Sequence, residues 1–186
     1  MNLVRVRISR LIYINCCVLF LLTGCVHRIH VSPAPDTTAS RSLPFHVGVE
    51  VPFVALEGAD HMPGIVLLEW TPEDLRDGII SYIEKRGTFE SVGGENGTLI
   101  LTVKAWLTLR APNHYVYHIH LESELGKRNE PPIGSYVASS QAKGSIVRWV
   151  TASDREPIQS ATSQALDSLL SQIEADRSRL LDGHTR

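Results

Sequence analysis

The histidines of one predicted strand have the clearest chemical potential in this sequence. Each is separated from the next, and the last from an acidic residue, by two or four positions: His114, His118, His120 and Glu122. Alternate residues of a strand point to one face of a sheet, and imidazole and carboxylate groups suit zinc, copper or nickel. The spacing therefore allows a metal site, which His46 and His61 would complete only if folding brings them close. The alternative interpretation is a solvent-facing polar strip that binds no metal.

A second candidate is an aromatic residue on the polar side of the strand that precedes the histidines. Trp106 shares an alternating face with Lys104 and Arg110. Aromatic and arginine side chains dominate binding hot spots, so an exposed Trp106 beside these cations would suit contact with a sugar or a protein. If a helix covers this face instead, Trp106 belongs to the core. The sequence leaves both interpretations open.

No catalytic motif accompanies these residues. The serines of the C-terminal half lie in a polar run without the Gly-x-Ser-x-Gly pattern of a nucleophile elbow: Ser135, Ser139, Ser140 and Ser145. The glycine-rich segment Gly93 to Gly97 lacks the lysine and hydroxyl residue of a phosphate loop, so we interpret it as a turn. We therefore predict that the protein is not an enzyme and has no cofactor.

The start of the chain has the features of a secretory leader. Arg5, Arg7 and Arg10 supply positive charge, and a mostly apolar stretch from Leu11 to Leu22 follows them. A helix that crosses a bilayer needs about 20 apolar residues, so a shorter stretch after a basic start is typical of a signal peptide. We predict that residues 1–24 are this signal peptide.

The leader ends in Leu22-Thr23-Gly24-Cys25, which resembles the lipobox of bacterial lipoproteins. The resemblance implies cleavage before Cys25 and acylation of that cysteine, which would anchor the mature protein to a membrane essentially permanently. Val26 stands where the inner-membrane retention signal of enterobacterial lipoproteins has Asp. The same resemblance therefore implies a lipid-anchored protein of the outer membrane that faces the periplasm.

Cysteine use and charge agree with this interpretation. The chain has 3 cysteines, of which Cys16 and Cys17 lie in the leader and Cys25 would carry lipid, so none is left for a disulfide. Removal of the leader takes away three arginines and no acid, which moves the formal charge from -2 to about -5. No cluster of Lys and Arg remains to neutralise phosphates, so we expect no nucleic-acid partner.

We predict one folded domain from residue 45 to 182, with a tail at 183–186. Residues 25–44 would hold the lipidated cysteine and a flexible tether, because the segment from His30 to Pro44 is rich in Ser, Thr and Pro. No internal repeat or second linker divides the rest of the chain. A domain of this size can build a core without disulfides.

Alternating apolar and polar residues predict the strands. The first runs from Val47 to Val51 and ends before Pro52. The longest alternation extends from Leu99 to Arg110, and the next from His114 to Glu122, so these two should pair as a hairpin. After a polar loop from Gly126 to Gly134, a last strand is expected at Ala142 to Val150.

Capping signals predict two helices. Thr71, Pro72 and Asp74 open the first, which ends at Gly87, and it follows a short apolar run that could itself be a strand, Gly64 to Trp70. The second opens at Ser153 and runs to about Leu181. The expected fold is α+β: an antiparallel sheet of about four strands with two helices packed on one face, in the order β-α-β-β-β-α.

This order of elements resembles that of small envelope lipoproteins, namely the lipopolysaccharide-assembly lipoprotein, auxiliary lipoproteins of ABC-type transport systems and the N-terminal domain of the Tol-Pal translocation protein. The likeness is carried by His46 to Val51, Thr71 to Leu75, Gly87 to Val92 and the long strand after them. It implies a non-catalytic accessory protein that binds a larger membrane assembly or transport complex. The alternative is a periplasmic lipoprotein that binds a small ligand or a metal through the histidine face.

Overall fold

The structure is a computed structural model, and the part of the chain that it describes begins at residue 26. It describes residues 26–28, 30–39, 42–58, 67–93, 97–110, 115–144 and 152–184. Cys25, His61, His114 and Trp149 lie outside these ranges, so the predictions that rest on them are not addressed by the fold. Among the described residues, no helix combines the length and the apolar character needed to cross a membrane.

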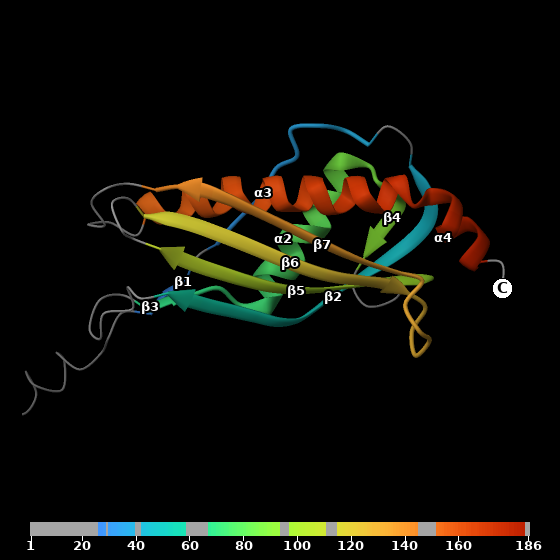
Figure 1. The fold of residues 1–186 in the computed structure, drawn as a ribbon, viewed down its shortest axis with the longest axis horizontal. Coiled ribbons are helices and arrows are strands. Elements are labelled where there is room, and N and C mark those ends of the chain that lie inside the picture. Colours follow the sequence, from blue (N-terminus) through green and yellow to red (C-terminus); the bar gives the residue numbers. More distant parts are fainter. Residues whose placement is uncertain are drawn as a thin grey trace, which may run out of the picture.

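A mixed sheet of 5 strands forms the body of the domain (Figure 1). Its strands are β2 (Leu43–Gly58), β4 (Phe89–Gly93), β5 (Leu99–Arg110), β6 (Val116–Gly126) and β7 (Gly134–Lys143). The spatial order is β4-β2-β5-β6-β7; β2 runs parallel to β4 and β5, whereas β5, β6 and β7 are antiparallel neighbours. A separate parallel pair consists of β1 (Val26–Arg28) and β3 (Leu67–Glu69).

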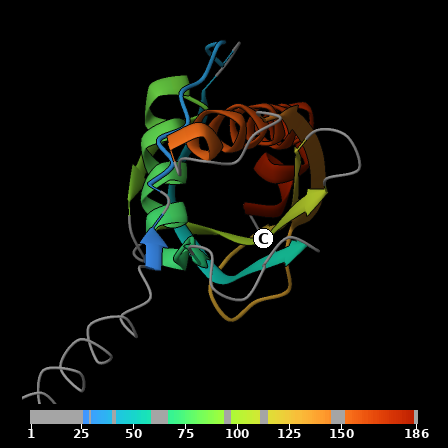
Figure 2. The same ribbon diagram turned by 90° about the vertical axis from the view of Figure 1, so that its left-hand side faces the viewer.

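Two long helices pack on the same face of this sheet. Helix α2 (Pro72–Arg86) lies against β2 and β4, and α3 (Ala152–Ala175) lies against β6 and β7. The short helix α4 (Arg177–His184) follows after a turn at Asp176. Figure 2 shows the sheet curving around the two long helices, and the buried residues of sheet and helices form one hydrophobic core.

Alternation decides which side chains of the sheet enter this core. In β5 every second residue from Leu99 to Leu109 is buried, whereas Lys104 and Arg110 are exposed. In β6 the residues opposite them, from Tyr117 to Leu125, follow the same pattern. Because a whole apolar face is removed from water against two helices, its burial supplies the main driving force for folding.

The termini of α2 are confirmed as predicted. Thr71 caps its N-terminus, and its side-chain oxygen accepts a hydrogen bond from the backbone N–H of Asp74 at 3.1 Å. Gly87 ends the helix in the left-handed conformation, with φ of 75°, and its N–H bonds to the carbonyl of Ile83. Glycine adopts this conformation without the penalty that a Cβ would bring.

The α+β class and the hairpin of β5 and β6 are confirmed, but the prediction of about four antiparallel strands in the order β-α-β-β-β-α was wrong. The expected order has no strand between the first helix and the turn at Gly93, whereas Phe89 to Val92 forms most of the edge strand β4. This strand has 5 residues and no regular alternation of burial, so periodicity could not reveal it. It lies parallel to β2 because a helix connects the two strands, as crossover connections require.

Strand β2 continues past the proline that we expected to end it. The register between β2 and β5 shifts between Glu50 and Phe53, and Pro52 lies within that irregularity. The missing N–H of proline is tolerated there because the regular ladder is already interrupted. β2 therefore extends to Gly58, which brings Phe53 into the sheet beside Lys104.

The C-terminal elements also differ from the prediction. The last strand, expected at Ala142 to Val150, is β7 and runs from Gly134 to Lys143, while residues 145–150 lie outside the described ranges. Serine and glycine have low strand propensity, which hid this alternation of small residues. The second helix, expected as one element to Leu181, is divided into α3 and α4 at Asp176.

The segment that we predicted as a flexible tether lies in large part against the domain. We call residues His30 to Ala39 the N-terminal strap. Val31 is only 5% exposed, and Pro33 is also buried. A Cβ added to Gly78 of α2 would lie 3.3 Å from both Pro33 Cδ and the Val31 carbonyl oxygen, so glycine permits this close approach of strap and helix.

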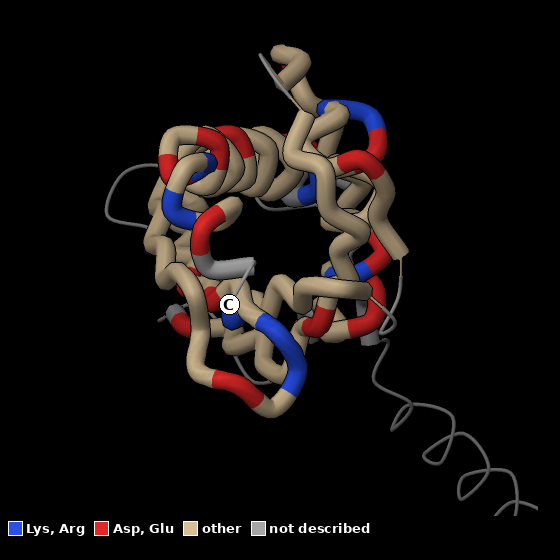
Figure 3. The backbone as a smooth tube through the Cα atoms, turned by 90° about the vertical axis from the view of Figure 1, so that its right-hand side faces the viewer, with Lys and Arg blue, Asp and Glu red and all other residues tan. Residues whose placement is uncertain are grey.

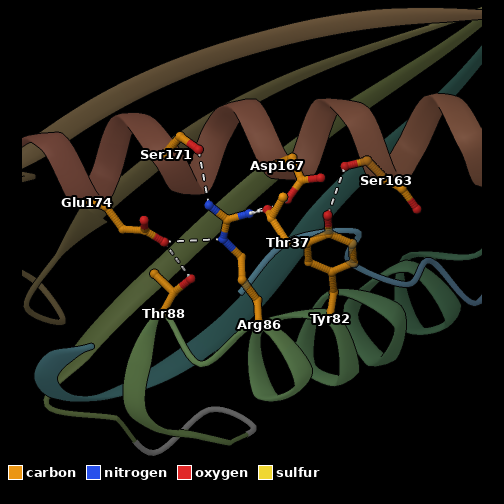
Figure 4. A network of polar contacts seen from close by, with 8 residues as sticks. All are labelled: Thr37, Tyr82, Arg86, Thr88, Ser163, Asp167, Ser171 and Glu174. Atoms are coloured by element: carbon orange, nitrogen blue, oxygen red, sulfur yellow. Dashed lines mark hydrogen bonds and ion pairs between the residues drawn. The ribbon is translucent and has the colours of Figure 1, made fainter. Parts of the chain in front are cut away.

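A buried arginine joins α2, α3 and the strap (Figure 4). Arg86 is 4% exposed, and its guanidinium contacts Asp167, Glu174, Ser171 and Thr37. It forms ion pairs with both acids of α3, and Nη1 donates to Thr37 Oγ1 of the strap at 3.0 Å. A buried charge is costly unless its donors are satisfied, and here α3 and the strap supply the acceptors.

We predict that Arg86→Ala lowers the free energy of unfolding by about 3 kcal/mol, because it leaves Asp167 and Glu174 without their cation. Urea denaturation followed by circular dichroism would measure this loss. The matched control is Arg179→Ala, which removes an ion pair to Asp176 from an arginine that is 62% exposed and should change stability by less than about 1 kcal/mol. Equal losses in the two variants would contradict a central role for Arg86.

A second prediction concerns Tyr136, a buried residue of β7 whose hydroxyl lies 3.3 Å from Asp176. Burial, and then the charge of Asp176, raise the pKa of Tyr136 to about 12. An unfolded chain releases this proton near pH ~10. Its contribution to stability is therefore complete below about pH 10 and is lost as the pH rises toward 12. Tyr136→Phe should make stability fall less steeply across this interval in urea titrations; an unchanged slope would exclude the assignment.

Candidate functional site

The face of the sheet that points away from the helices carries the candidate residues. Strand pairing arranges their side chains in three rows that cross β2, β5, β6 and β7 in turn. The rows are Phe53, Lys104, Glu122 and Val137; Ala55, Trp106, His120 and Ser139; and Glu57, Thr108, His118 and Gln141. We call these three rows the open face, since none of the described helices packs on it.

Trp106 occupies the centre of the open face between two other rings. Its ring centroid lies 5.4 Å from those of Phe53 and His120, with interplanar angles of 59° and 53°. Such tilted arrangements are favourable for aromatic rings. We call Phe53, Trp106 and His120 the aromatic band. The structure thus resolves the two interpretations of Trp106: it is half-buried by its neighbours in the sheet and not covered by a described helix.

Two exposed apolar side chains of the open face were not singled out from the sequence: Phe53, which belongs to the aromatic band, and Val137, which does not. Phe53 is 43% exposed and Val137 is 54% exposed, which makes them the large apolar residues most open to solvent among those described. Phe53 was missed because we ended the first strand at Pro52, and Val137 because β7 was assigned to a polar run. Tyr136, Val137 and Ala138 are consecutive apolar residues within that run, so alternation gave no signal for the second.

His120 is held by polar contacts at both ring nitrogens. Nδ1 lies 2.8 Å from Ser139 Oγ, and Nε2 lies 3.4 Å from Glu122 Oε1. A serine, a histidine and a glutamate in contact invite comparison with a hydrolase triad. Catalysis would also require donors for a developing oxyanion and shelter from water, whereas Ser139 is exposed on a strand at the edge of the sheet. We therefore interpret these contacts as fixing the imidazole ring against Trp106.

The histidines do not assemble a metal centre within the described residues. His118 and His120 share the open face with Glu122, as the spacing predicted. No group of three or more His, Cys, Asp or Glu in the described ranges is placed to hold a metal ion. His46 is not part of this face, because its Nδ1 lies 2.6 Å from Ser91 of β4. His114 and His61 lie outside the described residues.

The two cations predicted beside Trp106 occupy different places. Lys104 lies across from Phe53 on one side and Glu122 on the other, so it borders the aromatic band. Arg110 is the last residue of β5 and lies four residues beyond Trp106, a separation of about 13 Å along a strand. Lys104 therefore lies within the open face, whereas Arg110 lies at the end of the sheet.

A depression of about 600 Å³ lies at the β7 edge of the open face, where Gln141 lines it together with Glu156 and Gln164 of α3. Two smaller depressions lie on the same side of the sheet. One, of about 130 Å³, is lined in part by Lys104, Glu122 and Val137. Another, of about 220 Å³, lies next to the loop after β6, where Arg128 Nη2 pairs with Glu50 Oε1 at 2.7 Å. Pockets for small organic ligands usually enclose about 300–1,000 Å³, a size that of these three only the depression at the β7 edge reaches. Away from that edge, the shape of this face suits a broad partner better than a small molecule.

Charge does not divide the molecule into an acidic and a basic side. Figure 3 shows segments with Lys and Arg interspersed with segments with Asp and Glu around the described chain. On the open face Lys104 lies directly opposite Glu122. A partner would therefore be recognised by shape, apolar contact and local charge pairs rather than by a single strong field.

Comparison with solved structures supports the fold. The chain is similar to a DUF330 family protein of Xanthomonas campestris, with 15% identity and a TM-score of 0.54 over 83% of this chain and 98% of that one. It is also similar to a minor lipoprotein of Acinetobacter baumannii, with 12% identity and a TM-score of 0.44 over 67% and 94% of the two chains. No protein-family model matches the sequence, and neither does any curated protein.

We predict that Phe53 and Trp106 stabilise each other by about 0.5–1.5 kcal/mol beyond their separate burial, because their rings are in contact. A double-mutant cycle with Phe53→Leu and Trp106→Leu, measured by urea denaturation, would give this coupling energy. The control cycle pairs Trp106→Leu with Val116→Ala, a residue of β6 that lies opposite Arg110 and not Trp106. Additive effects in the first cycle would show that the band is not preformed.

Proposed function

We propose that this protein is a lipid-anchored, non-catalytic accessory protein of the bacterial envelope that binds a larger membrane assembly or transport complex through its open face. The observation that carries the proposal is the aromatic band, with Phe53 and Val137 exposed on a face that no described helix covers. The rings of the band are in contact with one another, and exposed apolar side chains gathered on one face are typical of a protein interaction site.

The arrangement of this surface supports a protein partner. Trp106 is the kind of side chain that dominates binding energy, and its neighbours in the sheet already hold its ring in place. A preformed surface loses little conformational entropy on binding. Lys104 and Glu122 lie between Phe53 and Val137 in the same row and are available for charge pairs with a partner, which would add specificity more than affinity.

The lipid anchor is the sequence-based half of the proposal. It rests on the leader and on the lipobox that ends at Cys25, together with the absence of any other cysteine in the mature chain. Val26 supports export to the outer membrane, with the domain facing the periplasm. Lipid on the cysteine and an interaction surface on the domain are the two features expected of an accessory protein that works beside a membrane complex.

The alternative, a periplasmic lipoprotein that binds a metal or a small ligand, depends on the pair His118 and His120. Both face solvent on β6, and two imidazoles with Glu122 make a weak cation site unless a further ligand joins them. Measurement of the metal content of the purified, lipidated protein separates the two functions. Stoichiometric zinc, copper or nickel that is lost in His118→Ala/His120→Ala would favour the alternative.

Photo-crosslinking in the native envelope tests the proposed docking surface. With a photoreactive amino acid at Gln141, on the open face, we expect capture of one large partner in a stoichiometric band that mass spectrometry identifies. Phe53→Glu/Val137→Glu should reduce this capture at least about tenfold, because two charges would be buried in an apolar contact. Both residues are exposed, so the domain should still fold.

The matched control adds the same two charges to the helix side of the domain. Gln164→Glu/Ser168→Glu changes two exposed residues of α3 and should leave the capture at Gln141 unchanged. If the two double variants capture the partner equally well, the open face is not the docking surface.

A further inference from the structure

The N-terminal strap follows helix α2 from end to end. At its start, His30 Nδ1 lies 3.3 Å from Asp74 Oδ1 in the first turn of the helix. At its end, the backbone N–H of Ala39 donates to the carbonyl of Arg86 at 2.8 Å. Between these contacts Val31 and Pro33 are buried, and Thr37 enters the network of Arg86. The chain is therefore fastened to the domain along the whole strap.

The fastening begins even earlier in the chain. β1 pairs in parallel with β3, in the register Val26↔Leu67 through Arg28↔Glu69. The first residue of β1 directly follows Cys25 in the sequence. Much of the segment that composition suggested as a flexible spacer between lipid and domain therefore contacts β3, α2 and α3.

We propose that the end of the domain formed by β1 and β3 rests directly on the lipid surface. This inference rests on the proposed function, because it takes Cys25 as acylated. Consecutive Cα atoms are about 3.8 Å apart, so an acylated Cys25 holds the bilayer within a few ångströms of β1. A free chain from His30 to Ser42 would instead reach up to about 45 Å from the membrane.

The same end of the molecule presents cations to such a surface. The C-terminal ends of β5 and β7 lie at this end of the sheet together with β1 and β3 (Figure 1). Arg110 and Lys143 end these two strands and are exposed, with the exposed Glu57 near the end of β2 and the exposed Glu156 of α3, which lines one depression with Lys143, as the acids nearby. Anionic headgroups attract cations placed this close to a membrane. In this proposal Arg110 contacts anionic headgroups and does not act together with Trp106.

This orientation also places the open face within reach of a membrane-embedded partner. The strands lead away from the lipid surface, and Trp106 lies four residues, or about 13 Å, from the membrane end of β5. The opposite end of the sheet, where the loop after β6 contains Glu130, lies about 40 Å from that surface, since β5 has 12 residues. The two ends differ enough for fluorescence energy transfer to separate them.

The test uses the full lipidated protein in vesicles of phosphatidylcholine and phosphatidylglycerol that contain a rhodamine-labelled headgroup lipid. Because the mature chain has no thiol besides the acylated Cys25, Gln141→Cys and Glu130→Cys each provide one site for a donor fluorophore. We expect strong energy transfer from residue 141, near the membrane end, and weak transfer from residue 130. Equal transfer from the two positions would overturn the proposed orientation.

A spacer variant tests whether the short connection sets this orientation. Insertion of a flexible Gly-Ser segment of about 12 residues between Cys25 and Val26 leaves the strap intact and should reduce transfer from residue 141 at least about twofold. Unchanged transfer would show that the connection does not hold the domain at the surface. The anchor is checked separately: absence of acyl chains on Cys25 by mass spectrometry, or sedimentation of Cys25→Ala with the membrane, would overturn the proposed function itself.

Discussion

The guanidinium of Arg86 is the contact on which the arrangement of this domain depends. It lies in α2 and binds acids of α3 and a threonine of the strap, so that one side chain connects three segments. Because this connection holds both helices on one face of the sheet, the other face has no described helix over it. The same contact fixes the path of the strap. The open face and the path of the strap therefore share one physical origin in the helix layer.

The sequence predicts the local elements well and their long-range pairing poorly. The alternation in β5 and β6 and the caps Thr71 and Gly87 are local signals, and the structure confirms them. The parallel pairing of β2 with β4 and β5 has no local signal, because it depends on how α2 returns the chain to the sheet. Trp106 and Lys104 could be identified as surface candidates, whereas Phe53 could not, since its place depends on a strand that continues through Pro52. Arg86 escaped notice because its acidic partners lie 81 and 88 positions away.

The open face illustrates how a sheet can be suited to recognition without an enclosed pocket. Its aromatic rings are supported from both sides within the sheet, so binding requires little rearrangement. The polar contacts of His120 serve the same purpose, because they fix a ring that packs on Trp106. In this interpretation His120, Ser139 and Glu122 position the rings of the aromatic band, although residues of these types also occur together in metal sites and hydrolases.

The N-terminal strap has a consequence for the order in which the domain forms. Its partners Arg86 and Asp167 lie 49 and 130 positions further along the chain than Thr37. Closing such long loops lowers the conformational entropy of the chain before the contacts form that compensate for this loss. By contrast, β5, β6 and β7 are joined by short connections. The antiparallel meander can therefore form early, and β2 must wait for β5. The strap, although it is synthesised before the helices that it contacts, is among the last segments to reach its final position.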